Sequence, residues 1–173
     1  IVTSKEFAQG SKLLRKYIDN AIIIPNGVNL EEFEIPYSKE QCRENLGLPQ
    51  IAKIILFVGN LSWYKAPDIL IKSMKTVIDF IPDAYLVVVG DGVMKPELIE
   101  LATKIGIGSS VKFAGFIVNE KSQYYKAADV FVLPSRSTES FGNVLLEASA
   151  SNLPLIASDY VGVRAIIQCG YNG

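Results

Sequence analysis

Short apolar runs rich in valine and isoleucine recur along the chain, and most are followed by a turn and a helical pattern. The runs that predict strands cover residues 53–59, 84–90, 110–116, 129–134 and 153–158. The intervening patterns predict helices over residues 67–80, 95–105 and 119–128 and from residue 142 onward. Short strands that alternate with helices are typical of βαβ units, and continuous runs such as LVVV indicate strands buried on both faces. We therefore expect an α/β domain with a parallel sheet and helices on both faces.

The first fifty residues follow a different pattern. The segments IVTS and AIIIP predict two short strands, with a helix between them near residues 5–18. The segment SKEQCRENLG predicts a further helix, which Ser38 can cap and Gly47 can end.

The parallel sheet directs attention to the loops that follow its strands. In open sheets of this kind, ligands bind outside the carboxyl ends of the strands. The loops at those ends are residues 59–66, 90–94, 115–119, 134–142 and 158–164.

Composition narrows the chemistry available to these loops. The 173 residues are enough for one domain with a sizeable core, and a formal net charge of −1 implies no basic face for nucleic acid. There is no histidine, which excludes a histidine base or a histidine metal site within this chain. Cys42 and Cys169 have neither metal-ligand spacing nor a disulfide framework, which fits a reducing compartment.

The stretch PSRSTESFGNVLLEASA is the strongest candidate site. Glu139 precedes an expected helix start at Gly142, and Glu147 lies about two turns into that helix. The amides of Phe141, Gly142 and Asn143 would be free donors in the first helical turn, and such amides favour anions. Carboxylates favour hydroxyls, so a ligand with both phosphate and sugar hydroxyls would suit this stretch. The alternatives are an exposed loop acid for Glu139 and a solvated helix face for Glu147.

Two other loops carry candidate ligand contacts. Lys65 lies just before the helix that begins at Pro67, where it can act as a point charge on phosphate or be a solvated surface lysine. Gly90 and Gly92 follow a strand and indicate either close backbone approach to a ligand or a tight turn. Lys95 stands where a dinucleotide fingerprint needs its third glycine, which argues against a nicotinamide or flavin site.

The remaining loops give weaker signals. Trp63 and Tyr64 can stack on a ligand or pack on the domain edge. Asn26-Gly27 favours a plain turn, and the same interpretation is preferred for the loop that holds Asp159 and Gly162.

Taken in order, five segments resemble one known family. They are PNGVNLEEF, FVGNLSWYKAPDIL, VVVGDG, VKFAGF and AADVFVLPSRSTESFGNVLLEASASNLPLIASD. Their order and spacing are similar to the C-terminal half of family 4 glycosyltransferases, the retaining enzymes of the GT-B fold. The resemblance covers nearly the whole chain and implies a Rossmann-like domain that forms one half of a GT-B fold.

The resemblance implies roles for the candidate residues. Lys65 would neutralise the donor diphosphate and Glu139 would bind hydroxyls of the donor sugar, which makes these two the expected catalytic residues. Glu147 would hold the ribose hydroxyls. The complete nucleotide-sugar-binding set would be Gly59, Asn60, Lys65, Gly90, Glu139, Ser140, Phe141, Gly142, Asn143 and Glu147.

Two positions depart from the family pattern. Asn60 stands where the family usually has an arginine, so a bidentate phosphate donor is lost that Lys65 cannot replace geometrically. Ala165 stands where an acid is usual, and the neighbouring Arg164 is a candidate to compensate for Asn60.

The implied function is transfer of a hexose from a GDP- or UDP-sugar with retention of configuration, with a lean to mannose. Neither a metal nor another cofactor would be required. The acceptor would be a sugar, lipid-linked or polysaccharide molecule in polysaccharide or glycolipid biosynthesis, bound by an N-terminal domain that precedes this chain. Residues 1–20 would form the junction with that N-terminal domain. Residues 1–173 would form the nucleotide-sugar-binding domain, truncated at both ends. The isolated chain would be inactive.

The sequence and the resemblance also imply a cellular location and leave two alternative functions open. We expect a cytoplasmic protein with no nucleic-acid partner, for which the resemblance allows peripheral association with the inner face of the membrane. One alternative is a non-catalytic nucleotide-sugar-binding module, suggested by Asn60 and Ala165. The other is a sugar-nucleotide epimerase of similar fold.

Overall fold

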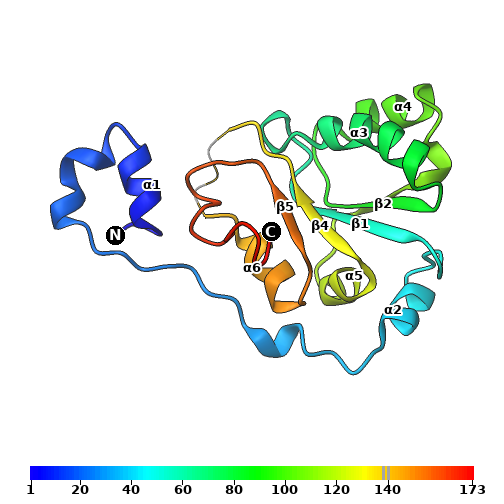
Figure 1. The fold of residues 1–173 in the computed structure, drawn as a ribbon, viewed down its shortest axis with the longest axis horizontal. Helices are drawn as coiled ribbons and strands as arrows, with labels where there is room; N and C mark the ends of the chain where they lie inside the picture. The colour runs from blue at the N-terminus through cyan, green and yellow to red at the C-terminus, as the bar shows by residue number, and fades with distance from the viewer. Residues whose placement is uncertain (138, 140) are drawn as a thin grey trace.

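A computed structural model of the protein describes residues 1–137, 139 and 141–173. It contains one five-stranded sheet in which every pair of neighbouring strands is parallel, in the order β3-β2-β1-β4-β5 (Figure 1). The strands are β1 (Lys53–Val58), β2 (Ala84–Val89), β3 (Val111–Gly115), β4 (Val130–Leu133) and β5 (Leu155–Ala157). All five strands that the apolar runs predict are therefore confirmed.

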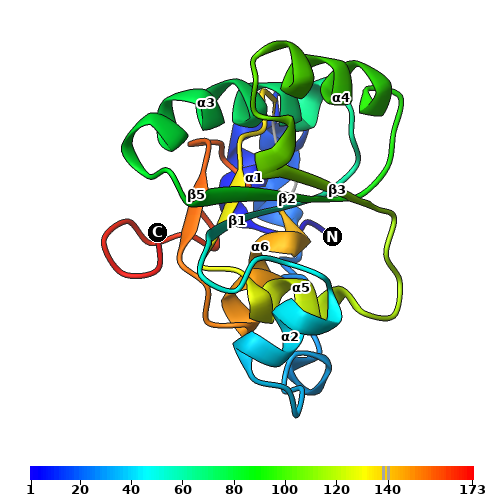
Figure 2. The ribbon, with the colours of Figure 1, turned by 90° about the vertical axis from the view of Figure 1, so that its right-hand side faces the viewer.

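Helices cover both faces of the sheet, as expected. The α-helices of this part of the chain are α2 (Lys39–Asn45), α3 (Pro67–Phe80), α4 (Lys95–Lys104), α5 (Lys121–Ala127) and α6 (Asn143–Ala150). Helices α3 and α4 lie on one face, whereas α2, α5 and α6 lie on the other (Figures 1 and 2). Because the central strands β1 and β2 lie between these layers, their side chains are buried in both directions, which explains why they read as continuous apolar runs. The Rossmann-like fold class is confirmed.

Local sequence signals set the helix ends. The Ser38 side chain accepts from the Gln41 amide and the Gln41 side chain accepts from the Ser38 amide, which forms a capping box at the start of α2. Gly47 follows α2 with a positive φ of 58°, as a glycine after a helix end is expected to do. Pro67 occupies the first turn of α3.

The N-terminal segment differs from the expectation. The two predicted strands are reduced to a single bridge between Val2 and Ile23. The predicted helix near residues 5–18 is two short helices, α1 (Lys5–Gly10) and the 3₁₀ helix η1 (Leu14–Asn20). Ser11 ends α1 in an extended conformation, and its side chain then accepts from the Leu14 amide, so the helix cannot continue through it.

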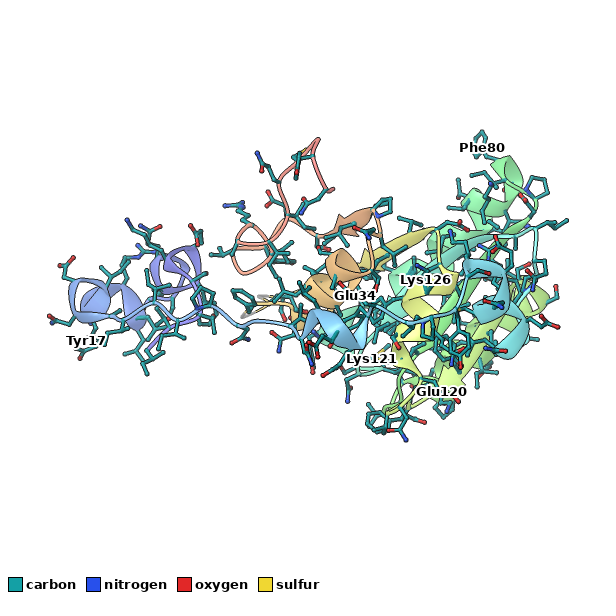
Figure 3. All side chains as sticks on the ribbon, turned by 90° about the horizontal axis from the view of Figure 1, so that it is seen from below. Tyr17, Glu34, Phe80, Glu120, Lys121 and Lys126 are labelled. Atoms are coloured by element: carbon teal, nitrogen blue, oxygen red, sulfur yellow. The ribbon has the colours of Figure 1, made fainter. Side chains whose placement is uncertain are left out.

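This segment stands away from the sheet, and Figure 3 labels Tyr17 at its far end. Residues 21–37, which include the 3₁₀ helix η2 (Leu30–Glu32), run as an extended connection to α2. A side chain at Gly10 would meet Val161, so α1 touches the loop after β5. That residues 1–20 form a junction with another domain stays a prediction.

Strand order determines where loops from different parts of the sequence meet. The chain builds outward from β1 to β2 and β3, and then returns to the other side of β1 with β4 and β5. The order therefore reverses between β1 and β4, and ligands of open α/β sheets bind at such a reversal. The loops after β1 and β4, residues 59–66 and 134–142, flank that point.

Two glycines after β2 allow the loop after β1 to approach closely. A Cβ atom added at Gly90 would lie 1.9 Å from the carbonyl oxygen of Gly59, and φ at Gly90 is 134°. At Gly92 an added Cβ would lie 2.6 Å from the carbonyl oxygen of Leu61. Both glycines are thus required by packing of backbone on backbone, independently of any ligand.

Replacing Gly90 with alanine tests this constraint. The added methyl group cannot fit without moving the Gly59 backbone, so Gly90→Ala is expected to lower the free energy of unfolding by more than about 2 kcal/mol in chemical denaturation. Gly27→Ala is the matched control, because a Cβ there meets nothing within 4 Å; the control should change stability by less than about 0.5 kcal/mol. Equal effects of the two substitutions would contradict the packing argument.

Candidate functional site

Lys65 and Glu139, from the loops after β1 and β4, meet in an ion pair. Lys65 ends the short 3₁₀ helix η3 (Trp63–Lys65), and its Nζ lies 2.6 Å from Glu139 Oε1. The hydroxyl of Ser135 donates to the same oxygen at 2.6 Å. The side chains of Lys65 and Glu139 are only 16% and 10% exposed, so neither is a solvated surface group. The reversal of strand order thus brings together the two expected catalytic residues, although they lie 74 positions apart.

Glu147 is held by two donors from α5. Its Oε1 accepts from Lys121 Nζ at 2.7 Å and its Oε2 accepts from the Tyr125 hydroxyl at 2.6 Å. The Glu147 side chain is 15% exposed, which excludes a solvated helix face. Burial, together with the neighbouring charge of Glu147, raises the pKa of the Tyr125 phenol far above its usual value. Tyr125 therefore remains a hydrogen-bond donor throughout the physiological pH range.

A cavity of about 680 Å³ opens at the carboxyl ends of β1 and β2. Four of the predicted residues line it, namely Gly59, Asn60, Gly90 and Glu147. The apolar side of the cavity comes from the loop after β3, residues 116–118, and from Val144 of α6. Lys121 also lines it and is a residue that the sequence analysis did not identify. A cavity of this size and mixed lining can hold a nucleotide-sized molecule.

The start of α6 faces the same edge of the sheet. Gly142 precedes the helix with φ of 79°, in the left-handed region that favours glycine. The amides of Phe141, Gly142 and Asn143 donate to no acceptor among the described residues, as expected for a helix N-terminus that can receive an anion. Ser140, the remaining predicted residue, lies outside the described residues.

The segment PNG, residues 25–27, contacts this helix start. The side-chain amide of Asn26 donates to Asn143 Oδ1 at 2.7 Å. The predicted plain turn at Asn26-Gly27 is wrong, because residues 24–29 form neither a turn nor a bend. The contact of Asn26 with Asn143 spans 117 positions, and no local sequence pattern indicates it.

Arg136 joins the two loops and was also missed. Its guanidinium donates to both oxygens of Asp68 at 2.7 Å and lies over the Trp63 ring. Its amide donates to the Tyr64 carbonyl, and its carbonyl accepts from the Tyr160 hydroxyl. Arg136 thus fixes the loop that carries Glu139 against the start of α3, next to Lys65. The alternation of strands and helices cannot reveal such a long-range pair.

The departures from the family pattern remain separate in space. Asn60 is exposed and lines the cavity, whereas Arg164 pairs with Asp159 in the loop after β5, with Nε 2.6 Å from Asp159 Oδ1. Arg164 and Asp159 line a different hollow, so Arg164 does not take the place of the missing arginine in this conformation. Ala165 is exposed in the same loop.

The described residues contain neither a metal-binding cluster nor a membrane-spanning helix. No three histidine, cysteine or carboxylate side chains there lie close enough together to hold a metal ion. No helix within the same residues combines the length and the apolar character needed to cross a membrane.

Comparison with known proteins identifies the class. The family model described as glycosyl transferases group 1 matches residues 38–173. A D-inositol 3-phosphate glycosyltransferase of Streptomyces scabiei is 34% identical, over 95% of this chain and 40% of the relative. The chain thus spans about two fifths of the length of such relatives.

Solved structures agree with this result. The Anabaena protein HepE, solved in complex with UDP and glucose, superimposes with a TM-score of 0.85 at 25% identity over 99% of this chain and 47% of HepE. The C-terminal domain of a glycosyl transferase group 1 family protein from Francisella tularensis gives a TM-score of 0.75 at 28% identity, over 85% of this chain and 78% of that domain.

The fold and the comparisons define a Rossmann-like domain of the GT-B type. The chain belongs to the group 1 family of glycosyl transferases, and its likeness to their C-terminal domain is confirmed.

The contact between Arg136 and Asp68 predicts a pH-dependent contribution to stability. The hydrogen bonds from Arg136 hold the pKa of Asp68 below its usual value of 3.8, although burial opposes this shift. Because the pKa is lowered on folding, the stabilisation is present above the usual pKa and is lost as the pH falls through the lowered value. Arg136→Met should therefore lower the free energy of unfolding by about 1–3 kcal/mol at pH 7.

Denaturation with urea at several pH values measures this difference. It should be constant between pH 7 and about pH 5 and should shrink below the usual pKa of 3.8. Arg15→Met, at an exposed arginine of the N-terminal segment, is the control and should give no such change near pH 4. A difference between wild type and Arg136→Met that is independent of pH would show that the ion pair contributes nothing.

Proposed function

We propose that the chain is the donor-binding half of a retaining glycosyltransferase that transfers a hexose from a nucleotide-diphosphate sugar. The observation that carries the proposal is the contact of Lys65 with Glu139 at the reversal of strand order. A phosphate-binding cation and a hydroxyl-binding carboxylate 2.6 Å apart suit the junction between the sugar and the diphosphate of such a donor. The nucleoside would occupy the adjacent cavity, with its ribose at Glu147.

The proposed mechanism is electrostatic. As the bond between the sugar and the diphosphate breaks, negative charge grows on the leaving phosphate. Lys65 and the amides of Phe141, Gly142 and Asn143 would stabilise that charge from fixed positions, without a metal ion. Glu139 would orient the sugar by accepting from its hydroxyls, and the sugar would transfer with retention of configuration.

The donor is proposed from the relatives. HepE has been solved with UDP and with UDP-glucose, which favours a UDP-hexose as the first donor to test. GDP-mannose, to which the family resemblance leans, stays a prediction. The acceptor would be a sugar, a lipid-linked sugar or a polysaccharide, bound by a part of the protein outside this chain. We place the reaction in the cytoplasm, with peripheral attachment to the membrane for a lipid-linked acceptor.

A non-catalytic binding module is the second candidate. Asn60 favours it, because it removes a bidentate phosphate donor from the cavity edge. A full-length protein that binds a nucleotide sugar but neither transfers nor hydrolyses it would support this candidate.

Substitutions at the ion pair separate the two proposed roles in the full-length protein. Lys65→Met should lower kcat/KM by roughly 100-fold or more, since a donor to developing charge is removed. It should also weaken binding of UDP more than binding of uridine. Glu139→Gln should lower kcat/KM by roughly tenfold or more. It should bind UDP at least as tightly as the wild type, because UDP has no sugar at that position and a neutral Gln leaves no unpaired carboxylate when Lys65 moves to the phosphate.

Lys75→Met is the matched control, at an exposed lysine of α3 that is 3.9 Å from its nearest acidic partner. Initial rates give kcat/KM and calorimetry with UDP, GDP and their sugars gives affinity. The proposal fails if neither nucleotide binds at millimolar concentration, or if Lys65→Met behaves like Lys75→Met.

A second prediction concerns the 173-residue chain alone. It should bind the nucleotide sugar but should neither transfer nor hydrolyse it, since the acceptor site is proposed to lie elsewhere in the protein. Calorimetry and mass spectrometry of the products test the two statements. Turnover by this chain alone would refute the division of roles.

A further inference from the structure

Both oxygens of Glu147 are held in place by donors that no role has yet explained. We infer that Lys121 and Tyr125 are positioning residues that fix the Glu147 carboxylate for a ribose diol. This inference rests on the proposed function, because it assumes that a nucleotide occupies the cavity. It adds two residues of α5 to the nucleotide site and predicts selectivity for ribonucleotides over deoxyribonucleotides.

The spacing of the two donors allows both to reach the carboxylate of Glu147. Lys121 and Tyr125 are four residues apart on α5, so their side chains lie on the same side of the helix. They reach across to α6, where Lys121 Nζ is 2.7 Å from Glu147 Oε1 and the Tyr125 hydroxyl is 2.6 Å from Oε2. Lys121, labelled in Figure 3, is the first residue of α5 and lines the cavity together with Glu147. The carboxylate is thus held at two points, which fixes its plane.

Tyr125 is itself immobilised by the core. It is fully buried, and its ring packs edge-on against Phe33, with centroids 5.7 Å apart. The ring also packs, in a tilted arrangement, against Phe131 of β4, with centroids 5.8 Å apart. The hydroxyl therefore cannot follow a displaced carboxylate. Because Phe131 belongs to β4, which lies between β1 and β5, this contact ties the position of Glu147 to the sheet.

The held carboxylate can still accept from a ligand. An ionised carboxylate has about four lone-pair sites, two on each oxygen. Lys121 and Tyr125 occupy one site on each oxygen, which leaves one on each for two neighbouring hydroxyls. Glu147 lines the cavity and its side chain is 15% exposed, so these remaining sites are accessible. Two hydroxyls on adjacent carbons, as in ribose, match two oxygens held in a fixed plane.

The test compares how tightly ribose and deoxyribose nucleotides bind to the full-length protein. The probes are UDP and GDP, each with its 2′-deoxy form, and calorimetry gives the four dissociation constants. For whichever base binds, the wild type should prefer the ribonucleotide by about tenfold, which corresponds to one hydrogen bond to a charged group. Glu147→Gln should reduce that preference to about twofold or less.

The positioning variants should lose the same preference while they keep the rest of the site. In Tyr125→Phe and Lys121→Met, the ratio of deoxy to ribo dissociation constants should fall to about threefold or less. Affinity for the deoxynucleotide should change by less than about twofold. Tyr124→Phe and Lys126→Met, on the same helix but outside the Glu147 cluster, should retain the wild-type ratio. Melting curves check that each variant is folded, and Lys121→Met remains informative if Tyr125→Phe is not.

Each result has a distinct meaning. If the wild type binds neither UDP nor GDP, the proposed function fails and this inference fails with it. If Glu147→Gln loses the preference but Tyr125→Phe and Lys121→Met keep it, only this inference is overturned. If Lys121→Met weakens both nucleotides equally, Lys121 contacts the ligand directly and its positioning role is wrong.

Discussion

The arrangement of the site depends on one constraint, the reversal of strand order between β1 and β4. A parallel sheet that grew in one direction only would place each loop beside the next one in sequence. The return of the chain to the free side of β1 instead sets the loop of Lys65 beside the loop of Glu139. The Arg136 contact with Asp68 then holds these two loops together, and the close approach of Gly90 to Gly59 packs the loop after β2 against the loop of Lys65. The strand order thus brings Lys65 and Glu139, the charge pair at the centre of the proposed site, close together, and side-chain contacts then fix their positions.

The sequence predicts those parts of the fold that are encoded locally. The buried strands are continuous apolar runs, Pro67 marks a helix start, and Ser38 with Gln41 forms a capping box. It fails between residues 1 and 24, where the apolar runs that predict strands form only one bridge. A single pair of short strands is marginal without a sheet to join, so an apolar pattern alone does not decide its conformation.

The sequence allowed the main residues of the candidate site to be predicted, but not their hydrogen-bond and ion-pair partners. Lys65 and Glu139 stand out because each lies just before a helix start after a strand, and Glu147 because it lies within the second of these helices. Their partners come from distant positions, as when Lys65 pairs with Glu139 across 74 residues. One signal was available, namely the spacing of four between Lys121 and Tyr125 in a predicted helix. It identifies two side chains on one face, but it cannot reveal that α6 presents a carboxylate to that face.

The pairing of Lys65 with Glu139 bears on how a donor would be recognised. A largely buried ion pair is stable only while both charges are compensated. Removing one partner leaves the other as an uncompensated buried charge, which costs free energy. A phosphate that attracted Lys65 away from Glu139 would therefore leave the carboxylate without its cation. A complete nucleotide sugar avoids this cost, because its sugar hydroxyls can donate to Glu139 while its diphosphate accepts from Lys65. In the proposed site, the same ion pair would thus favour the whole donor over an isolated phosphate.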